Sequence, residues 1–166
     1  MSAIAAACWK EGISRKTKIP AAATISPASI TVPSGATSAT ATLTTYPVVA
    51  NTLVTLSAKA GGTHTCHVTV AAPAIKKVQV LPSKVVGGAG VQTGTITLTG
   101  PVATNTTIAI STNNANAIVP ANVVVTAGSN VATFQVTTKH VIVAAPAVIT
   151  ATGATNAASY TITIKP

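Results

Sequence analysis

The sequence of 166 residues has almost no acidic side chains. Glu11 is the only one, and neither Asp nor Glu occurs from Gly12 to Pro166. Nucleophilic hydrolysis usually relies on a carboxylate that orients the base, and glycosidases rely on a pair of carboxylates. Calcium sites are also lined mainly by carboxylates. We therefore expect no enzymatic activity and no cofactor.

Aromatic side chains are almost as scarce, at 2% of the sequence, although apolar residues make up 48%. The core must then be built from Val, Ile, Leu and Ala, with Thr on the solvent-exposed faces. β-Branched residues favour the pleated, half-buried surface of a strand, so the composition predicts an all-β protein. The lack of aromatic rings also argues against sugar binding by stacking.

Negative charge is missing but positive charge is not, since ten Lys and Arg residues give a formal net charge of +9. Lys10, Arg15, Lys16 and Lys18 form the only basic cluster, and Trp9 alone is near enough in the sequence to stack on a base. Nucleic-acid-binding proteins combine a concentrated basic face with aromatic or base-reading side chains. We therefore expect no nucleic-acid partner, and lysines that keep the surface soluble and protect strand edges.

Only two cysteines are present, so the chain has one disulfide or none. In the segment THTCHVTV, Cys66 shares a strand face with Val68 and Val70, which favours a buried thiol. The alternative is a bridge from Cys8 to Cys66, which would tie the N-terminal segment to the first module.

Other site motifs are few. His64, Cys66 and His67 are the only group of metal-type ligands, and strand alternation turns His67 away from the other two, so we expect no metal site. No apolar run approaches the 18 residues of a membrane span, and we predict none. The sequon at Asn105 is a candidate glycosylation site.

Residues 27–45 are echoed at residues 120–138. The shift is constant, because Pro27 to Pro120 and Gly35 to Gly128 both span 93 residues. A repeat of this period is the size of one small β-sandwich, and it predicts tandem modules.

Alternation and turn residues predict seven strands in the second module, which is the pattern of an immunoglobulin-like sandwich. The first module has only four. The strands of the second are expected near residues 76–81, 91–99, 105–112, 121–126, 131–138, 147–152 and 157–165. Those of the first are expected near 28–32, 37–45, 52–59 and 63–71.

The first module therefore lacks the first three strands of the second. We divide the chain into an N-terminal segment (1–25, a possible donor strand or linker), a partial module (26–73) and a complete module (74–166). Half a sandwich leaves its apolar face and strand edges open. The missing strands come from the N-terminal segment or from another subunit, unless the chain is part of a longer array.

Two segments, VPSGATSATATLTTYPVVANTLVTLSAKAGGTHTCHVTV (residues 32–70) and SKVVGGAGVQTGTITLTGP (residues 83–101), resemble the immunoglobulin-like repeats found in tandem in large bacterial surface and secreted proteins. The resemblance covers roughly residues 26–166. It implies a location outside the cell or at its surface, and use as a spacer, stalk, adhesive module or decoration of surfaces, including phage particles.

The shortfall of strands favours a structural role as subunit of an extracellular filament or surface assembly, a homopolymer joined by β-strand complementation. Ile4, Trp9, Ile13 and Ile19 are the apolar residues expected to anchor the N-terminal segment in a groove. The alternative function is an adhesive or carbohydrate-binding module, or a virion decoration domain.

Overall fold

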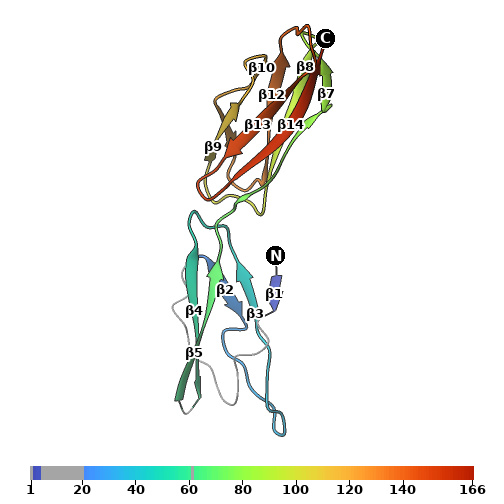
Figure 1. Ribbon diagram of the computed structural model, residues 1–166. Coiled ribbons are helices and arrows are strands. Elements are labelled where there is room, and N and C mark those ends of the chain that lie inside the picture. The colour runs from blue at the N-terminus through green and yellow to red at the C-terminus, as the bar shows by residue number, and fades with distance from the viewer. Residues whose placement is uncertain (1, 5–20, 61) are drawn as a thin grey trace. The chain divides into compact units, whose positions relative to one another are not determined.

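The computed structural model describes residues 2–4, 21–60 and 62–166. Within these residues every regular element is a β-strand, which confirms the predicted all-β class (Figure 1). The chain divides into two compact units, residues 1–72 (unit 1) and residues 73–166 (unit 2). The described part of the chain has no helix that is long and apolar enough to cross a membrane.

Unit 2 is an immunoglobulin-like sandwich of two sheets, and all seven strands predicted for it are present. One sheet has the order β10-β12-β8-β6, and the other has the order β11-β9-β13-β14-β7. Every pairing is antiparallel except the parallel pair β14–β7. The strands are β6 (Ile75–Leu81), β7 (Lys84–Val86), β8 (Val91–Leu98), β9 (Thr106–Thr112), β10 (Ala117–Ile118), β11 (Asn122–Val125), β12 (Val131–Thr138), β13 (Ala145–Thr152) and β14 (Ala157–Lys165).

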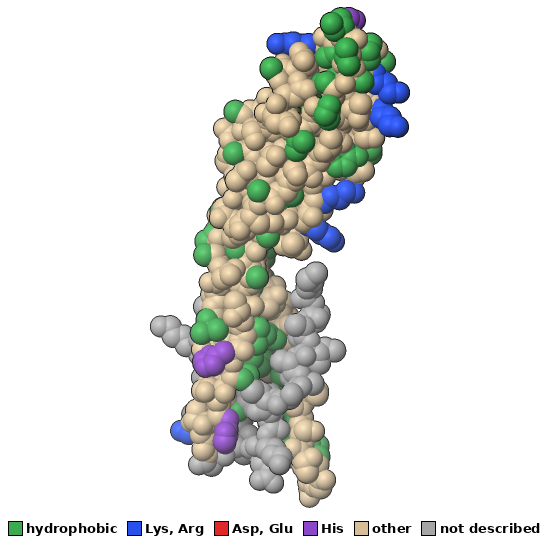
Figure 2. Space-filling view, viewed as in Figure 1, with side chains coloured by type: hydrophobic (Ala, Val, Ile, Leu, Met, Phe, Trp, Pro, Cys, Tyr) green, Lys and Arg blue, Asp and Glu red, His purple; other side chains and the backbone are tan. Residues whose placement is uncertain are grey.

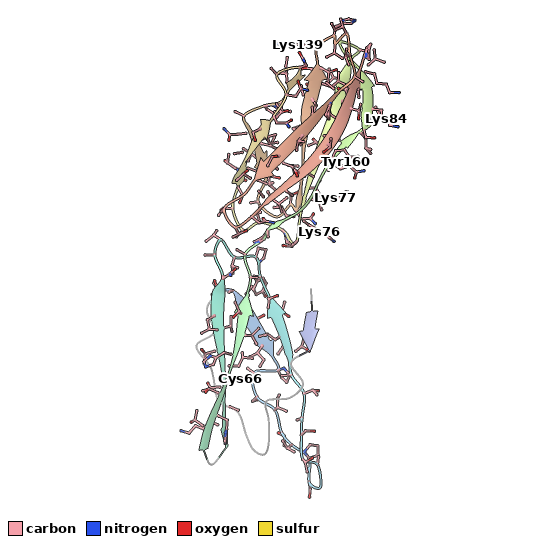
Figure 3. All side chains as sticks on the ribbon, in the orientation of Figure 1. Cys66, Lys76, Lys77, Lys84, Lys139 and Tyr160 are labelled. Atoms are coloured by element: carbon pink, nitrogen blue, oxygen red, sulfur yellow. The ribbon has the colours of Figure 1, made fainter. Side chains whose placement is uncertain are left out.

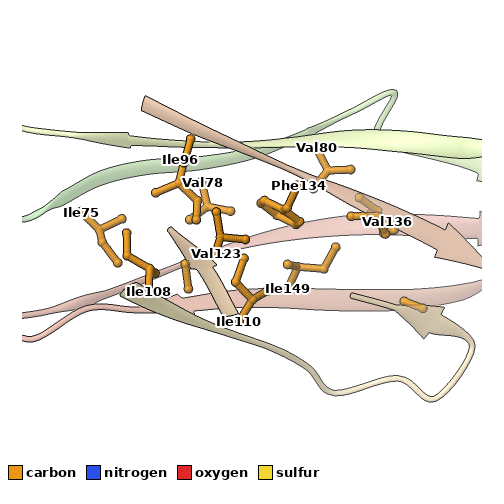
Figure 4. Close-up of a cluster of buried hydrophobic side chains, with 14 of the residues drawn as sticks. Ile75, Val78, Val80, Ile96, Ile108, Ile110, Val123, Phe134, Val136 and Ile149 are labelled. Atoms are coloured by element: carbon orange, nitrogen blue, oxygen red, sulfur yellow. The ribbon is translucent and has the colours of Figure 1, made fainter. Parts of the chain in front are cut away.

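The core of unit 2 lies between these sheets and follows from strand alternation. On β12, for example, Ala132, Phe134 and Val136 are buried while the residues between them face outward. The buried side chains of both sheets form one cluster, part of which Figure 4 shows. Aliphatic residues dominate the cluster, as the scarcity of aromatic residues predicts.

In the described residues of unit 1, five strands form two smaller sheets. A three-stranded sheet has the order β1-β3-β2, and a two-stranded sheet consists of β4 and β5, all antiparallel. The strands are β1 (Ser2–Ile4), β2 (Ala23–Ser26), β3 (Thr42–Thr45), β4 (Thr52–Ala60) and β5 (Gly62–Val70).

Two predictions for the first module are wrong. Residues 28–32 form no strand, and only Thr42–Thr45 of the predicted strand 37–45 forms one. In unit 2 the segment equivalent to 28–32 contains β11, which pairs with β9. A strand needs a neighbour for its backbone groups, and the described part of unit 1 has no counterpart of β9.

The turn at the centre of the repeat is nevertheless kept in both units. Gly35 and Gly128 adopt φ values of 84° and 79°, a left-handed conformation that glycine adopts without steric cost. The same backbone hydrogen bond closes each turn, from Ala36 N to Pro33 O and from Ser129 N to Thr126 O, both at 3.0 Å. The repeat therefore preserves local turn chemistry even where strand pairing differs.

Candidate strand-acceptor site

The edge of β3 in unit 1 is the first part of the candidate site. In the 93-residue repeat, β3 corresponds to the last four residues of β12. Strand β12 lies between β10 and β8 in its sheet. Strand β2 takes the place of β10 beside β3: Ala23 pairs with Thr45, and Tyr46 N donates to Ala22 O at 2.8 Å. In unit 2, Lys139 N makes the corresponding bond to Asn116 O at 2.8 Å.

Strand β1 takes the place of β8, on the other edge of β3. Thr44 pairs with Ser2, whereas its counterpart Thr137 pairs with Val91 at the start of β8. The pairing of β8 with β12 extends over seven residues, but that of β1 with β3 extends over three. This difference explains why β3 is shorter than β12. Residues 38–41 correspond to a part of β12 that pairs with β8, but β1 does not extend far enough to pair with them.

Strand β4 provides a second edge at which unit 1 differs from unit 2. Its counterpart β13 pairs with β14 on one side and, through residues 149–152, with β9 on the other. In the described part of the chain, the only strand that pairs with β4 is β5. The equivalent stretch of β4 is residues 56–59, and no described strand stands in the place of β9 beside it (Figure 1).

Unit 1 has an apolar cluster of its own. Among the described residues this cluster contains six buried residues, and the cluster of unit 2 contains twenty-one. Its larger members are Leu43, Val54 and Leu56, none of them more than 2% exposed. We did not predict these residues as a site, although shifting Val136 and Ile149 back by 93 residues leads to Leu43 and Leu56.

Of the four predicted anchor residues, Ile4 lies in β1, where its backbone pairs with Thr42. Trp9, Ile13 and Ile19 lie outside the described residues, so their anchoring role stays a prediction. The basic cluster predicted between Lys10 and Lys18 also lies outside them.

Cys66 lies on β5 opposite Leu56 and packs, half-buried, against the apolar cluster of unit 1 (Figure 3). Val68 and Val70 pack against the same cluster, as strand alternation predicts. Cys8 lies outside the described residues, so the Cys8–Cys66 disulfide stays a prediction.

The remaining candidate residues have structural partners. His67 Nδ1 lies 3.0 Å from Thr55 Oγ1 across the β4–β5 pair, and the described residues contain no group of three or more potential metal ligands. Asn105 is exposed, and its Oδ1 accepts a hydrogen bond from Ala127 N at 2.9 Å. Its glycosylation stays a prediction.

The two sheets of unit 2 and their strand pairings define the class of the fold, which is an immunoglobulin-like β-sandwich. No protein-family model matches the chain, and no curated protein matches its sequence.

Solved structures with a similar fold include two fragments of intimin. The chain is 18% identical to the D00-D0 domain of intimin, with a TM-score of 0.45, over 93% of this chain and 86% of that one. It is 16% identical to the D0-D1 domain of intimin, with a TM-score of 0.47, over 93% and 79%. Domains 4 and 5 of the S-layer protein SbsC are 18% identical, with a TM-score of 0.42, over 76% and 62%.

Proposed function

We propose that the chain is a structural subunit of an extracellular filament or surface assembly, in which a strand from a neighbouring copy completes unit 1. One observation carries this proposal: β1 occupies the place of β8 but pairs with only three residues of β3. A strand held by so few main-chain hydrogen bonds can leave its own unit, and the edge of β3 that it leaves is an acceptor for the same strand of another chain.

Strand β1 is the donor in this proposal. Residues 5–22 connect it to β2, and an extended chain of that length spans at most about 60 Å. That reach is enough for β1 to pair with β3 of a neighbour in the register seen here, Ser2 with Thr44 and Ile4 with Thr42. Exchange of an identical element costs little, because the same contacts form between copies as within one.

The geometry of exchange decides the kind of assembly. If two copies exchange β1 reciprocally, the assembly closes as a dimer; if each copy donates to the next, it stays open and grows as a filament. We propose the open arrangement.

Deleting residues 1–4, which removes β1 and leaves β2 in place, tests the proposal. Negative-stain microscopy should show regular polymers of the full chain and none of the deletion variant, because the variant lacks the donor strand. Substitution Ala3→Pro is a milder test, since proline cannot donate a ladder hydrogen bond, and Ala3→Val serves as its matched control. A deletion variant that still assembles normally refutes the proposal, as does a full chain that remains monomeric.

A further inference from the structure

The end of unit 2 opposite to the one at which the chain enters is built from three loops and the strand residues beside them, which we call the apical end (residues 84–91, 113–118 and 139–144). Backbone hydrogen bonds hold these loops together: Gly88 N donates to Thr138 O at 2.9 Å, and Lys139 N donates to Asn116 O at 2.8 Å. Gly87 is buried against the backbone of His140, where an added Cβ would lie 3.1 Å from the Cα atom. The loops therefore form one packed surface.

This surface exposes aliphatic side chains. Ile142 and Val143 are 88% and 71% exposed, although their neighbour Val141 is buried in the core. Because Val141 anchors the loop, the two residues that follow project into solvent. Val91 and Ile118 are exposed as well, and both pair with Thr137 in the adjoining sheet. Figure 2 shows hydrophobic side chains on the surface at this end of unit 2.

Exposed lysines surround these aliphatic residues. Lys84, Lys139 and Lys165 lie at the apical end, to which Gly87 N ties the C-terminal strand by donating to Lys165 O at 2.8 Å. Figure 3 labels Lys84 and Lys139 there and the other two lysines of unit 2, Lys76 and Lys77, towards the opposite end. Unit 2 contains no acidic residue, so no carboxylate side chain within it neutralises the apical lysines.

We propose that the apical end docks onto a lipid bilayer that contains anionic lipids, with Ile142 and Val143 entering the interface and the lysines facing the headgroups. The exposed aliphatic residues match the apolar interior of such a bilayer, and the lysines around them match its anionic headgroups. A second copy of this chain offers only one carboxylate side chain, Glu11, and would bring like charges together. A soluble polyanion would engage the lysines and leave the aliphatic residues in water.

The test is flotation of the full chain with phosphatidylcholine vesicles and with vesicles that also contain phosphatidylglycerol. Flotation is preferable to sedimentation because a filament also pellets. The chain should float only with the anionic vesicles. The double variant Ile142→Asn/Val143→Asn should bind at least about tenfold more weakly, because two apolar side chains no longer leave water. Lys139→Gln should weaken binding about fivefold through the loss of one cation near the surface.

The internal repeat supplies a matched control. Val49 in unit 1 corresponds to Ile142 and is 75% exposed. The loop of Val49 has Tyr46 at the position that Lys139 occupies in the apical loop. Val49→Asn should bind anionic vesicles like the parent chain. A chain without residues 1–4 should also bind, because docking does not depend on strand exchange, which keeps this test separate from that of filament formation.

Three results would overturn the proposal. One is absence of flotation with anionic vesicles, and another is unchanged flotation of the double variant. The third concerns self-association: if the double variant, without vesicles, has a lower mass than the parent chain in analytical ultracentrifugation, the apical residues form a contact between copies.

Discussion

The ring of Phe134 on β12 lies directly over Gly94 on β8, its cross-strand partner. A Cβ atom added to Gly94 would overlap the ring. The only phenylalanine of the chain thus fills the space left by a buried glycine within the central pair of its sheet.

We expect Gly94→Ala to destabilise unit 2 by about 1–3 kcal/mol, because the ring must leave its position in a filled core. Gly100→Ala is the matched control, since an added Cβ would meet no atom within 4 Å there. Urea unfolding of the full chain, followed by circular dichroism, compares the two variants. Equal midpoints for the unit 2 transition would contradict the packing described.

The side chain of Asn156 joins the last hairpin of unit 2 to the start of its first strand. Its Oδ1 accepts from Ile75 N at 2.9 Å, and its Nδ2 donates to Ile75 O at 2.8 Å. Asn156→Ala leaves two partly buried backbone groups without these partners, so we expect a loss of about 1–3 kcal/mol. The exposed Asn130, changed to Ala, should have little effect on the free energy of unfolding measured in the same way.

The two units should differ in their ability to fold alone. Residues 73–166 hold a sandwich with a continuous core, so we expect a single cooperative thermal transition. Residues 1–72 have six buried residues in their described apolar cluster and few strand neighbours, so this fragment should melt without cooperativity or associate. Circular dichroism and calorimetry of both fragments measure this. A cooperative, monomeric fragment 1–72 would show that unit 1 needs no completion.

Much of unit 2 follows from its sequence, because alternation within a long strand is a local signal. The strand predicted at 131–138 coincides with β12, and the one predicted at 157–165 coincides with β14. We missed β7 and β10, which have three and two residues and are too short to show alternation.

Unit 1 is harder to predict because its strands depend on neighbours rather than on their own residues. Residues 28–32 carry the same pattern as β11 and yet form no strand. Strand β1 pairs with β3, which lies far from it in the sequence, and the three residues of β1 contain no local signal for this pairing. The buried Leu43 and Leu56 are recognisable only after the two copies of the repeat are superimposed.

The pairing of Ser2 with Thr44 allows the exchange of β1 between chains to be tested by an intermolecular disulfide. In a background without the native cysteines, a chain with Ser2→Cys is mixed with a longer, tagged chain with Thr44→Cys and allowed to assemble before oxidation. Strand exchange predicts a disulfide-linked heterodimer whose bridge, located by peptide mass spectrometry, joins positions 2 and 44 of different chains. If these single variants never link, while a chain carrying both cysteines forms the bridge only within itself, β1 closes its own unit and is not exchanged between copies.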